Sequence, residues 1–194
     1  MLKSLEDKFN LYCNSKNLEI NHNQILVIKN LQDYYNKNFS SFFINFFFKK
    51  THKKSFYLYG DVGVGKTMIL DFFFDKIQEK KKRLHFNEFM LNFHDFAHER
   101  KNKKDQNVIN LFVKNLKSEV SLLYFDEFQV TNIADAMILG KLFDDIFKEN
   151  IKIILTSNTK ISELYKEGLQ RDQFKPFKKL LEKRSFDHDL KIED

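Results

Sequence analysis

The amino-acid sequence predicts an α/β fold in which a parallel β-sheet is flanked by helices and preceded by an N-terminal helical segment. Short apolar stretches of strand type alternate with stretches in which apolar residues recur every three or four positions, the order expected of βαβ units. Two of the strand-type stretches, SLLYF and IKIIL, are continuously apolar, as in parallel strands buried on both faces. A glycine-rich turn, GDVGVG, joins the first strand to its helix.

Residues 1–54 are predicted to form the helical segment that leads into the core, which takes up residues 55–194. From Leu5 to Phe48 the apolar spacing is helical, and the basic run KKTHKK then separates this segment from the first strand. The most apolar window, FSSFFINFFF from Phe39, is about half of the ~20 residues needed to span a bilayer. We expect a buried amphipathic helix there, with an interfacial membrane helix as the alternative.

Within the core, strands and helices are expected to alternate. Strands are predicted at SFYLYG, at RLHFNEF with a turn at its end, at SLLYF and at IKIILTSN. Helices are predicted at MILDFFFDKIQ, FMLNFHDFAHER, VINLFVKNLK, NIADAMILGKLFDDIFKEN and ISELYKEG. Gly168 is expected to close the last of these helices, because glycine is common just after a helix ends.

GDVGVGKT, between the first strand and its helix, matches the P-loop pattern G-x-x-x-x-G-K-[ST] and not the dinucleotide pattern G-x-G-x-x-G. Glycines let the backbone curl around a phosphate with N–H groups pointing inward, and the helix N-terminus adds the positive end of its dipole. Lys66 is predicted to bind the β- and γ-phosphates, and the Thr67 hydroxyl to ligate Mg²⁺. The predicted nucleotide-binding residues are Gly60, Asp61, Val62, Gly63, Val64, Gly65, Lys66, Thr67 and Met68.

Two adjacent acids follow the strand SLLYF. In P-loop enzymes a carboxylate at the end of a neighbouring strand holds Mg²⁺, usually through water, and Asp126 is placed for that role. Glu127 is predicted to be the general base that polarises an attacking water. Because a small-molecule kinase needs no such water activator, the pair favours ATP hydrolysis. The alternative is that the two acids only cap the next helix.

Two residues further along the chain are candidates for the same chemistry. Asn158, at the end of IKIILTSN, is predicted to hydrogen-bond the γ-phosphate or the attacking water, the alternative being an ordinary turn residue. Arg171, in LQRDQF, is predicted to reach the nucleotide of a neighbouring subunit and stabilise transition-state charge. The alternative for Arg171 is a surface arginine or a partner of Asp172.

Composition limits the other classes of function. The net charge of +6 is compatible with nucleic acid, anionic lipid or nucleotide, but the basic runs lack the aromatic interleaving of nucleic-acid grooves. The single cysteine, Cys13, excludes an internal disulfide and fits a reducing compartment. No secretory signal is predicted, because the N-terminus carries acids and no apolar core. His94 and His98 share a helix face but lack a third metal ligand, and His85 is expected near the phosphate site.

Four segments together resemble a known family. They are YLYGDVGVGKTMILDFFF, RLHFNEFML, LLYFDEFQVTNIADAMILGKLF, and LTSN with the later LYKEGLQRDQFKPF. These segments are similar to the ZapE family of bacterial AAA+ ATPases and its mitochondrial Afg-type relatives. DEFQVTNIADAMIL and GLQRDQFKPF are more specific to this family than the P-loop. The resemblance runs from about Phe9 to Phe177 and includes NLEINHNQILVIKNL.

The resemblance implies an AAA+ core, hydrolysis of ATP with Mg²⁺, and a ring-like homo-oligomer. By motif position it assigns Lys66 and Thr67 to phosphate and Mg²⁺, Asp126 and Glu127 to the second acidic motif, Asn158 to the sensor and Arg171 to the intersubunit finger. Bacterial members are division-associated ATPases, and mitochondrial members are linked to quality control of respiratory-chain proteins. A bacterial cytoplasmic protein is therefore expected, with a protein client or division-machinery partner and peripheral contact with the inner membrane.

The chain departs from the family pattern in two places. Asn132 stands where the family has an acid, and we expect it to cap the next helix equally well. Only SFDHDLKIED is available for a last core strand, so the C-terminal helical lid of the family is expected to be absent or truncated. Ring assembly is then expected only if a lid is supplied.

Three functions remain open from the sequence. The first is an ATPase that couples hydrolysis to conformational work on a protein partner. The second is a nucleic-acid-linked AAA+ module of helicase-loader type, motivated by the net charge of +6 and the runs KKKR and ERKNKK. The third is a nucleotide-binding switch with little turnover, motivated by the missing lid.

Overall fold

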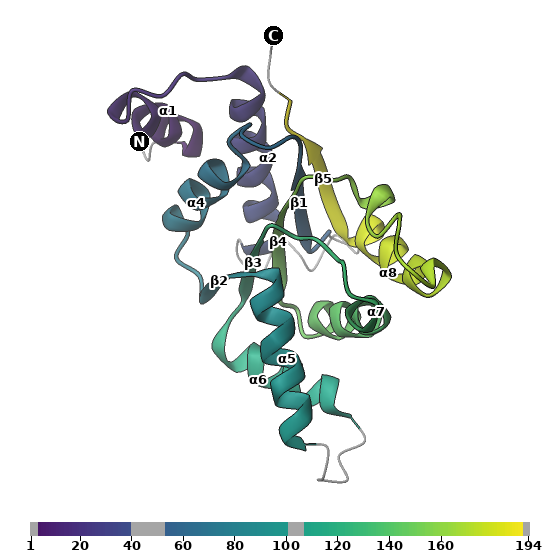
Figure 1. Cartoon of the computed structure of the whole chain (residues 1–194). Helices are drawn as coiled ribbons and strands as arrows, with labels where there is room; N and C mark the ends of the chain where they lie inside the picture. Colours follow the sequence, from purple (N-terminus) through teal and green to yellow (C-terminus); the bar gives the residue numbers. More distant parts are fainter. Residues whose placement is uncertain (1–3, 40–52, 101–106, 192–194) are drawn as a thin grey trace.

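The computed structural model describes residues 4–39, 53–100 and 107–191, which contain a five-stranded sheet with helices on both faces (Figure 1). The strands are β1 (Ser55–Tyr59), β2 (Lys81–His85), β3 (Leu122–Asp126), β4 (Lys152–Ser157) and β5 (Ser185–Asp189). Their order is β2-β3-β4-β1-β5, and the neighbouring strands all pair in parallel. The predicted parallel α/β fold is confirmed.

Helices cover the two faces of the sheet because side chains alternate along each strand. Phe56 and Leu58 of β1 pack towards α1 (Leu5–Ser15), α2 (His22–Phe39) and α4 (Lys66–Lys76). Tyr57, between them, packs on the opposite face in the larger cluster. That cluster is covered by α5 (Phe86–Arg100), α6 (Val108–Glu119), α7 (Ile133–Lys148) and α8 (Arg171–Arg184).

The strand order determines what lies between the P-loop and the acids. Asp126 ends β3, and β1 leads into the P-loop. β4 pairs with both strands and lies between them. The polar residues at the end of β4 therefore lie between the P-loop and the two acids, which makes β4 a structural part of the site.

α8 (Arg171–Arg184) forms where no helix was predicted, and two predicted segments differ in local structure. ISELYKEG does not form an α-helix: only a 3₁₀ turn, η1 (Ile161–Glu163), is present, and Tyr165 has a left-handed backbone with φ 57°. Gly168 is thus not a helix cap but lies against the Tyr165 ring, where a Cβ would overlap the ring. The second difference is at Phe86, where α5 begins directly after β2 without the expected turn.

The apolar window that begins at Phe39 lies, after its first residue, outside the described residues. Among the residues that the structure describes, no helix is long and apolar enough to cross a membrane. The expectation for Asn132 is confirmed, since it is the N-cap of α7 and its side-chain oxygen accepts a hydrogen bond from the Ala134 N–H at 2.8 Å.

Candidate nucleotide-binding site

A cavity of about 330 Å³ lies at the carboxyl ends of β1, β3 and β4. In parallel α/β sheets this is the edge at which ligands bind. The cavity brings the P-loop together with Glu127 and Asn158. Its lining residues are Val62, Gly63, Gly65, Lys66, Thr67, Met68, Glu127, Thr156, Ser157 and Asn158.

The glycines of the P-loop are required by close approaches as well as by backbone angles. Gly60 has φ 149°, and a Cβ there would overlap the carbonyl of Leu190, just after β5. Gly65 has φ 93°, and a Cβ there would lie 2.9 Å from the side-chain nitrogen of Gln24, near the start of α2. Any other residue at Gly60 would push the loop away from the Leu190 backbone. At Gly65 the Gln24 side chain can move, and the positive φ is what favours glycine.

Lys66 is folded back into its own loop. Its ammonium donates hydrogen bonds to the carbonyls of Gly60 at 2.8 Å and Asp61 at 2.6 Å, and the residue is only 8% exposed. Burial lowers the pKa of Lys66 from its ordinary value, while Asp61 and Asp126 oppose the shift. The loop therefore holds a buried cation whose present acceptors are neutral carbonyl oxygens.

Asp126 is the most constrained group of the site. Its Oδ1 accepts hydrogen bonds from Thr156 at 2.6 Å and from Thr67 at 3.3 Å, and its Oδ2 accepts one from Arg83 at 2.6 Å. Burial would raise the pKa of Asp126, but the hydrogen bonds from Thr156 and Arg83 outweigh it, and the pKa is lowered. Asp126 is thus a buried carboxylate that stays ionised. Together with the Thr67 hydroxyl it offers the oxygen donors that Mg²⁺ prefers.

Glu127 has the opposite environment, since its side chain is 82% exposed and lines the cavity. Its backbone is left-handed, with φ 54°, a conformation that costs about 1–2 kcal/mol in a non-glycine residue. The Glu127 N–H donates to the Thr156 hydroxyl at 2.9 Å and to Asp126 Oδ1 at 3.2 Å. These bonds hold the strained turn, which points one acid into the sheet and the next towards the cavity. His85 Nδ1 lies 3.8 Å from the Glu127 carboxylate, at the expected end of β2.

The paired acids do not cap the following helix. That helix, α7, begins at Ile133 and is capped by Asn132. Both acids instead make contacts at the end of the sheet, with Thr67, Thr156 and His85. The alternative in which they serve only as a helix start is therefore excluded by the geometry.

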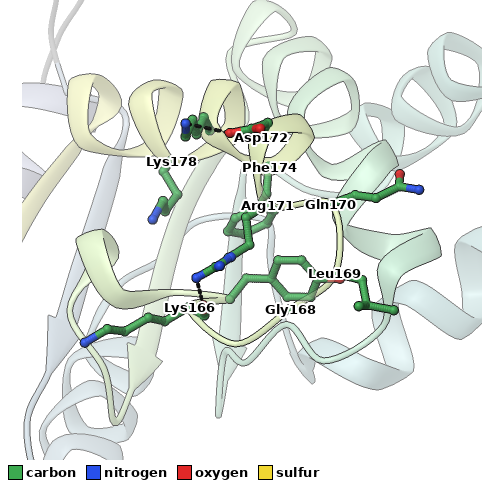
Figure 2. A pocket seen from close by; sticks show the side chains of 10 residues that line it. Lys166, Gly168, Leu169, Gln170, Arg171, Asp172, Phe174 and Lys178 are labelled. Carbon is green, nitrogen blue, oxygen red and sulfur yellow. Dashed lines mark hydrogen bonds and ion pairs between the residues drawn. The ribbon is translucent and has the colours of Figure 1, made fainter.

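Arg171 lies outside this cavity. It lines a second, larger cavity of about 640 Å³ at the start of α8, where Lys166, Lys175 and Lys178 also gather (Figure 2). The Arg171 guanidinium donates to the Lys166 carbonyl at 2.8 Å, whereas Asp172 pairs with Lys175 at 2.6 Å. The larger volume does not make this the better candidate for a nucleotide site, because residues of the P-loop, Glu127 and Asn158 line the smaller cavity.

Three residues of the site were not found from the sequence. Thr156 bridges both acids, Arg83 binds Asp126, and Gln24 donates to the Val64 carbonyl of the P-loop at 3.3 Å. Thr156 lies near the end of β4, two positions before Asn158, which is a signal that the sequence offered. Arg83 and Gln24 have no comparable signal, because their contacts depend on strand order and helix placement.

The histidines of α5 form no metal site with the residues that the structure describes. No group of three or more His, Cys, Asp or Glu side chains gathers as metal ligands in residues 4–39, 53–100 and 107–191. His94 instead pairs with Asp135, in the first turn of α7, at 2.6 Å. This pair links α5 to α7.

Comparison with known proteins places the chain among P-loop ATPases. A family model described as AFG1-like ATPase matches residues 14–187. Lactation elevated protein 1 homolog B of Danio rerio is 42% identical over 134 residues, which cover 64% of this chain and 27% of that protein. Cell division protein ZapE of Escherichia coli K12 is 40% identical over 129 residues, covering 66% of this chain and 34% of that protein. The chain thus spans about a third or less of the length of these relatives.

Solved structures share the fold at low sequence identity. Domain III of the Thermotoga maritima replication initiation protein DnaA has a TM-score of 0.61 at 15% identity, covering 92% of this chain and 67% of that one. The DnaC helicase loader has a TM-score of 0.55 at 14% identity, covering 89% and 92%. At these identities the likeness concerns the fold alone, and it confirms the predicted P-loop AAA+ core.

Proposed function

The chain belongs to the family of AFG1-like ATPases, and from this premise we propose that it binds ATP with Mg²⁺ at the P-loop cavity and hydrolyses the γ-phosphate. The observation that carries the proposal is the single cavity that the P-loop, Glu127 and Asn158 share. A buried cation, an oxygen pair suited to Mg²⁺ and an exposed carboxylate are the three parts that hydrolysis of a nucleoside triphosphate requires.

Binding is assigned to the P-loop and to the start of α4. Lys66 exchanges the carbonyls of Gly60 and Asp61 for phosphate oxygens, which are stronger acceptors because they are charged. The N-terminus of α4 supplies free N–H groups and the positive end of the helix dipole. Thr67 and Asp126 hold Mg²⁺, which when bound neutralises charge on the phosphates.

Catalysis is assigned to Glu127 and Asn158. Glu127 is the general base: its carboxylate is exposed at the cavity, and its backbone is fixed by the Thr156 hydroxyl. Asn158 follows β4 at the same cavity and hydrogen-bonds the γ-phosphate or the attacking water. The two acids differ in role because they differ in burial: the buried Asp126 would hold the metal, and the exposed Glu127 can contact water.

Steady-state phosphate release and nucleotide binding test this proposal. Lys66→Ala should lose both, whereas Glu127→Gln should lose release by about 100-fold or more and still bind ATP. Glu182→Gln, which removes an exposed acid on α8, is the matched control and should behave as the wild type. Normal turnover in Glu127→Gln would show that the base is assigned wrongly. Binding without turnover in the wild type would favour the alternative of a nucleotide switch.

Arg171 is proposed to act on the nucleotide of a neighbouring subunit in a homo-oligomer. Support comes from its position, since it lines the cavity at the start of α8 (Figure 2) and does not line the P-loop cavity of its own chain. Mixing two inactive variants tests the proposal. Subunits of the Arg171→Ala variant still carry Glu127, and subunits of the Glu127→Gln variant still carry Arg171. A mixture of the two should therefore recover part of the activity at interfaces that combine both intact residues. Activity should also rise steeply with protein concentration, and a mixture as inactive as its components would refute a role across an interface.

The work that hydrolysis drives is proposed to be a conformational change in a protein partner. The name of the E. coli relative, cell division protein ZapE, supports a division-machinery client. A bacterial cytoplasmic location, peripheral to the inner membrane, is part of the same proposal. A nucleic-acid partner is less favoured, because Lys81 of the KKKR run donates to backbone carbonyls and Arg83 is paired with acids. DNA binding that weakens steeply with salt would reverse this preference.

A further inference from the structure

Arg83 links the strand that carries Asp126 to the helix that carries Thr67. It lies on β2, in register with Tyr124 of the neighbouring β3. One guanidinium nitrogen donates to Asp126 Oδ2 at 2.6 Å, and another donates to Asp71 Oδ2, on α4, at 2.8 Å. Arg83 thus uses the forked geometry of arginine to join two carboxylates from different elements.

These contacts close into a ring. Thr67 and Asp71 are four residues apart on α4 and so lie on the same face of that helix. Thr67 donates to one oxygen of Asp126, and Asp71 accepts from the arginine that binds the other. The ring therefore joins the first turn after the P-loop to the end of β3 through two routes.

The ring fixes the rotation of the Asp126 carboxylate. Thr156 and Thr67 on Oδ1 leave that oxygen facing α4, and Arg83 on Oδ2 prevents the group from turning. The guanidinium also makes a cation–π contact with the Tyr124 ring, with 5.1 Å between the guanidinium carbon and the ring centroid. Arg83 also compensates Asp71, whose buried Oδ1 has no hydrogen-bond partner among the residues described.

We propose that Arg83 is a positioning residue that orients Asp126, and through Asp71 the first turns of α4, for binding the metal that accompanies the nucleotide. This inference rests on the proposed function. Groups that hold a metal-binding carboxylate in place affect metal affinity by about 10- to 100-fold when removed.

Removing Arg83 also has an effect that would raise the affinity for Mg²⁺. Arg83 is a cation near the metal position, so its removal lessens the repulsion of Mg²⁺. The Arg83 side chain is 39% exposed, and solvent screens this repulsion, whereas its hydrogen bond is made to a carboxylate that is only 5% exposed. The loss of orientation should therefore outweigh the relief of repulsion, and the sign of the change in metal affinity separates the two effects.

The experiment titrates a fluorescent non-hydrolysable ATP analogue against the full chain, first in EDTA and then over a series of free Mg²⁺ concentrations. The variants are Arg83→Gln, Arg83→Lys and Asp71→Asn. Lys82→Gln is the matched control, because it removes one positive charge from the next position on β2, whose side chain lines a groove on the other face. Circular dichroism checks that each variant is folded, and Arg83→Lys keeps the charge if Arg83→Gln does not fold.

In Arg83→Gln, the free Mg²⁺ concentration that gives half of the maximal increase in affinity for the analogue should rise by about 10- to 100-fold. The affinity for the analogue in EDTA should be unchanged. Arg83→Lys should recover only part of the loss, because one ammonium cannot bridge two carboxylates in the arginine geometry. Asp71→Asn should show a smaller loss and add nothing to Arg83→Gln. An unchanged or lower Mg²⁺ requirement in Arg83→Gln, with a normal wild type, overturns this inference alone. A wild type that does not bind the analogue in Mg²⁺ overturns the proposed function as well.

Discussion

Replacing Thr156 with valine should destabilise the protein through the two acids, although it changes no charge and little volume. Thr156 is 1% exposed at the end of β4. Its hydroxyl donates to Asp126 at 2.6 Å and accepts from the Glu127 N–H at 2.9 Å. Valine keeps the shape of the side chain and removes both interactions at once.

The expected magnitude follows from these contacts. A hydrogen bond to a charged group contributes about 1.5–3 kcal/mol, and a buried carboxylate that loses one donor keeps its desolvation cost. The Glu127 N–H retains Asp126 Oδ1 at 3.2 Å, so that donor is not left without a partner. The free energy of unfolding should therefore fall by about 1.5–3 kcal/mol, which is about 1 M in the urea midpoint for a slope of roughly 2 kcal/mol per M.

Equilibrium unfolding in urea, at neutral pH and with EDTA present, measures this change without a metal contribution. Thr159→Val makes the same chemical change at an exposed position and should shift the free energy by less than about 0.5 kcal/mol. A Thr156→Val loss as small as that of Thr159→Val would refute the conclusion that the Thr156 hydroxyl holds the acids. A changed slope would instead indicate an altered denatured state or loss of two-state behaviour.

Three further predictions concern stability. Burial and the nearby Lys54 and Lys117 lower the pKa of Lys152 from 10.5 to about 8. Between pH 8 and 10.5 the unfolded chain therefore binds more protons than the folded chain, and the free energy of unfolding of the wild type should rise with pH. Lys152→Met should lack this rise and be more stable at pH 7 by about 1 kcal/mol in urea unfolding. Burial also lowers the pKa of His188 below its ordinary value of 6.5, so the stability of the wild type should fall as the pH drops below 6.5. Thermal midpoints of His188→Gln should fall less with pH, and the difference should correspond to less than about 1 kcal/mol because solvent screens this half-buried group. Gly168→Ala should cost about 1–3 kcal/mol in urea unfolding by displacing the Tyr165 ring, and an equal cost in a Tyr165→Ala background would refute that cause.

The sequence was sufficient for the sheet and for the P-loop because both depend on local pattern. Continuous apolar runs specify buried parallel strands, and SLLYF and IKIIL become β3 and β4 as predicted. The P-loop is also local, since its glycines, Lys66 and Thr67 are contiguous. ISELYKEG was predicted wrongly for a tertiary reason: Tyr165 packs on Phe174 of α8, with 5.1 Å between ring centroids, and takes a left-handed backbone that a helix excludes.

Two of the site residues that the sequence did not reveal, Arg83 and Thr156, depend on strand order. The sequence KKKR does not indicate which of its four basic residues contacts Asp126. Only the register of β2 against β3 brings Arg83 next to that carboxylate. The same holds for Thr156, whose role follows from the place of β4 between β1 and β3. Sequence patterns predict the reacting groups, whereas the groups that contact them are apparent only once the strands are arranged in the sheet.

This distribution of contacts implies which part of the site responds to nucleotide. Asp126 is held by Thr156 from β4 and by Arg83 from β2, so its position is set by the sheet. Lys66 is held by carbonyls of the P-loop, and it must release them before it can bind phosphate. The contact from Arg83 to Asp126 joins two opposite charges, whereas the ammonium of Lys66 bonds only neutral carbonyls. Binding should therefore rearrange the P-loop while the end of β3 stays in place, and the Thr67 hydroxyl, which contacts Asp126 across that boundary, is where the rearrangement meets the fixed acid.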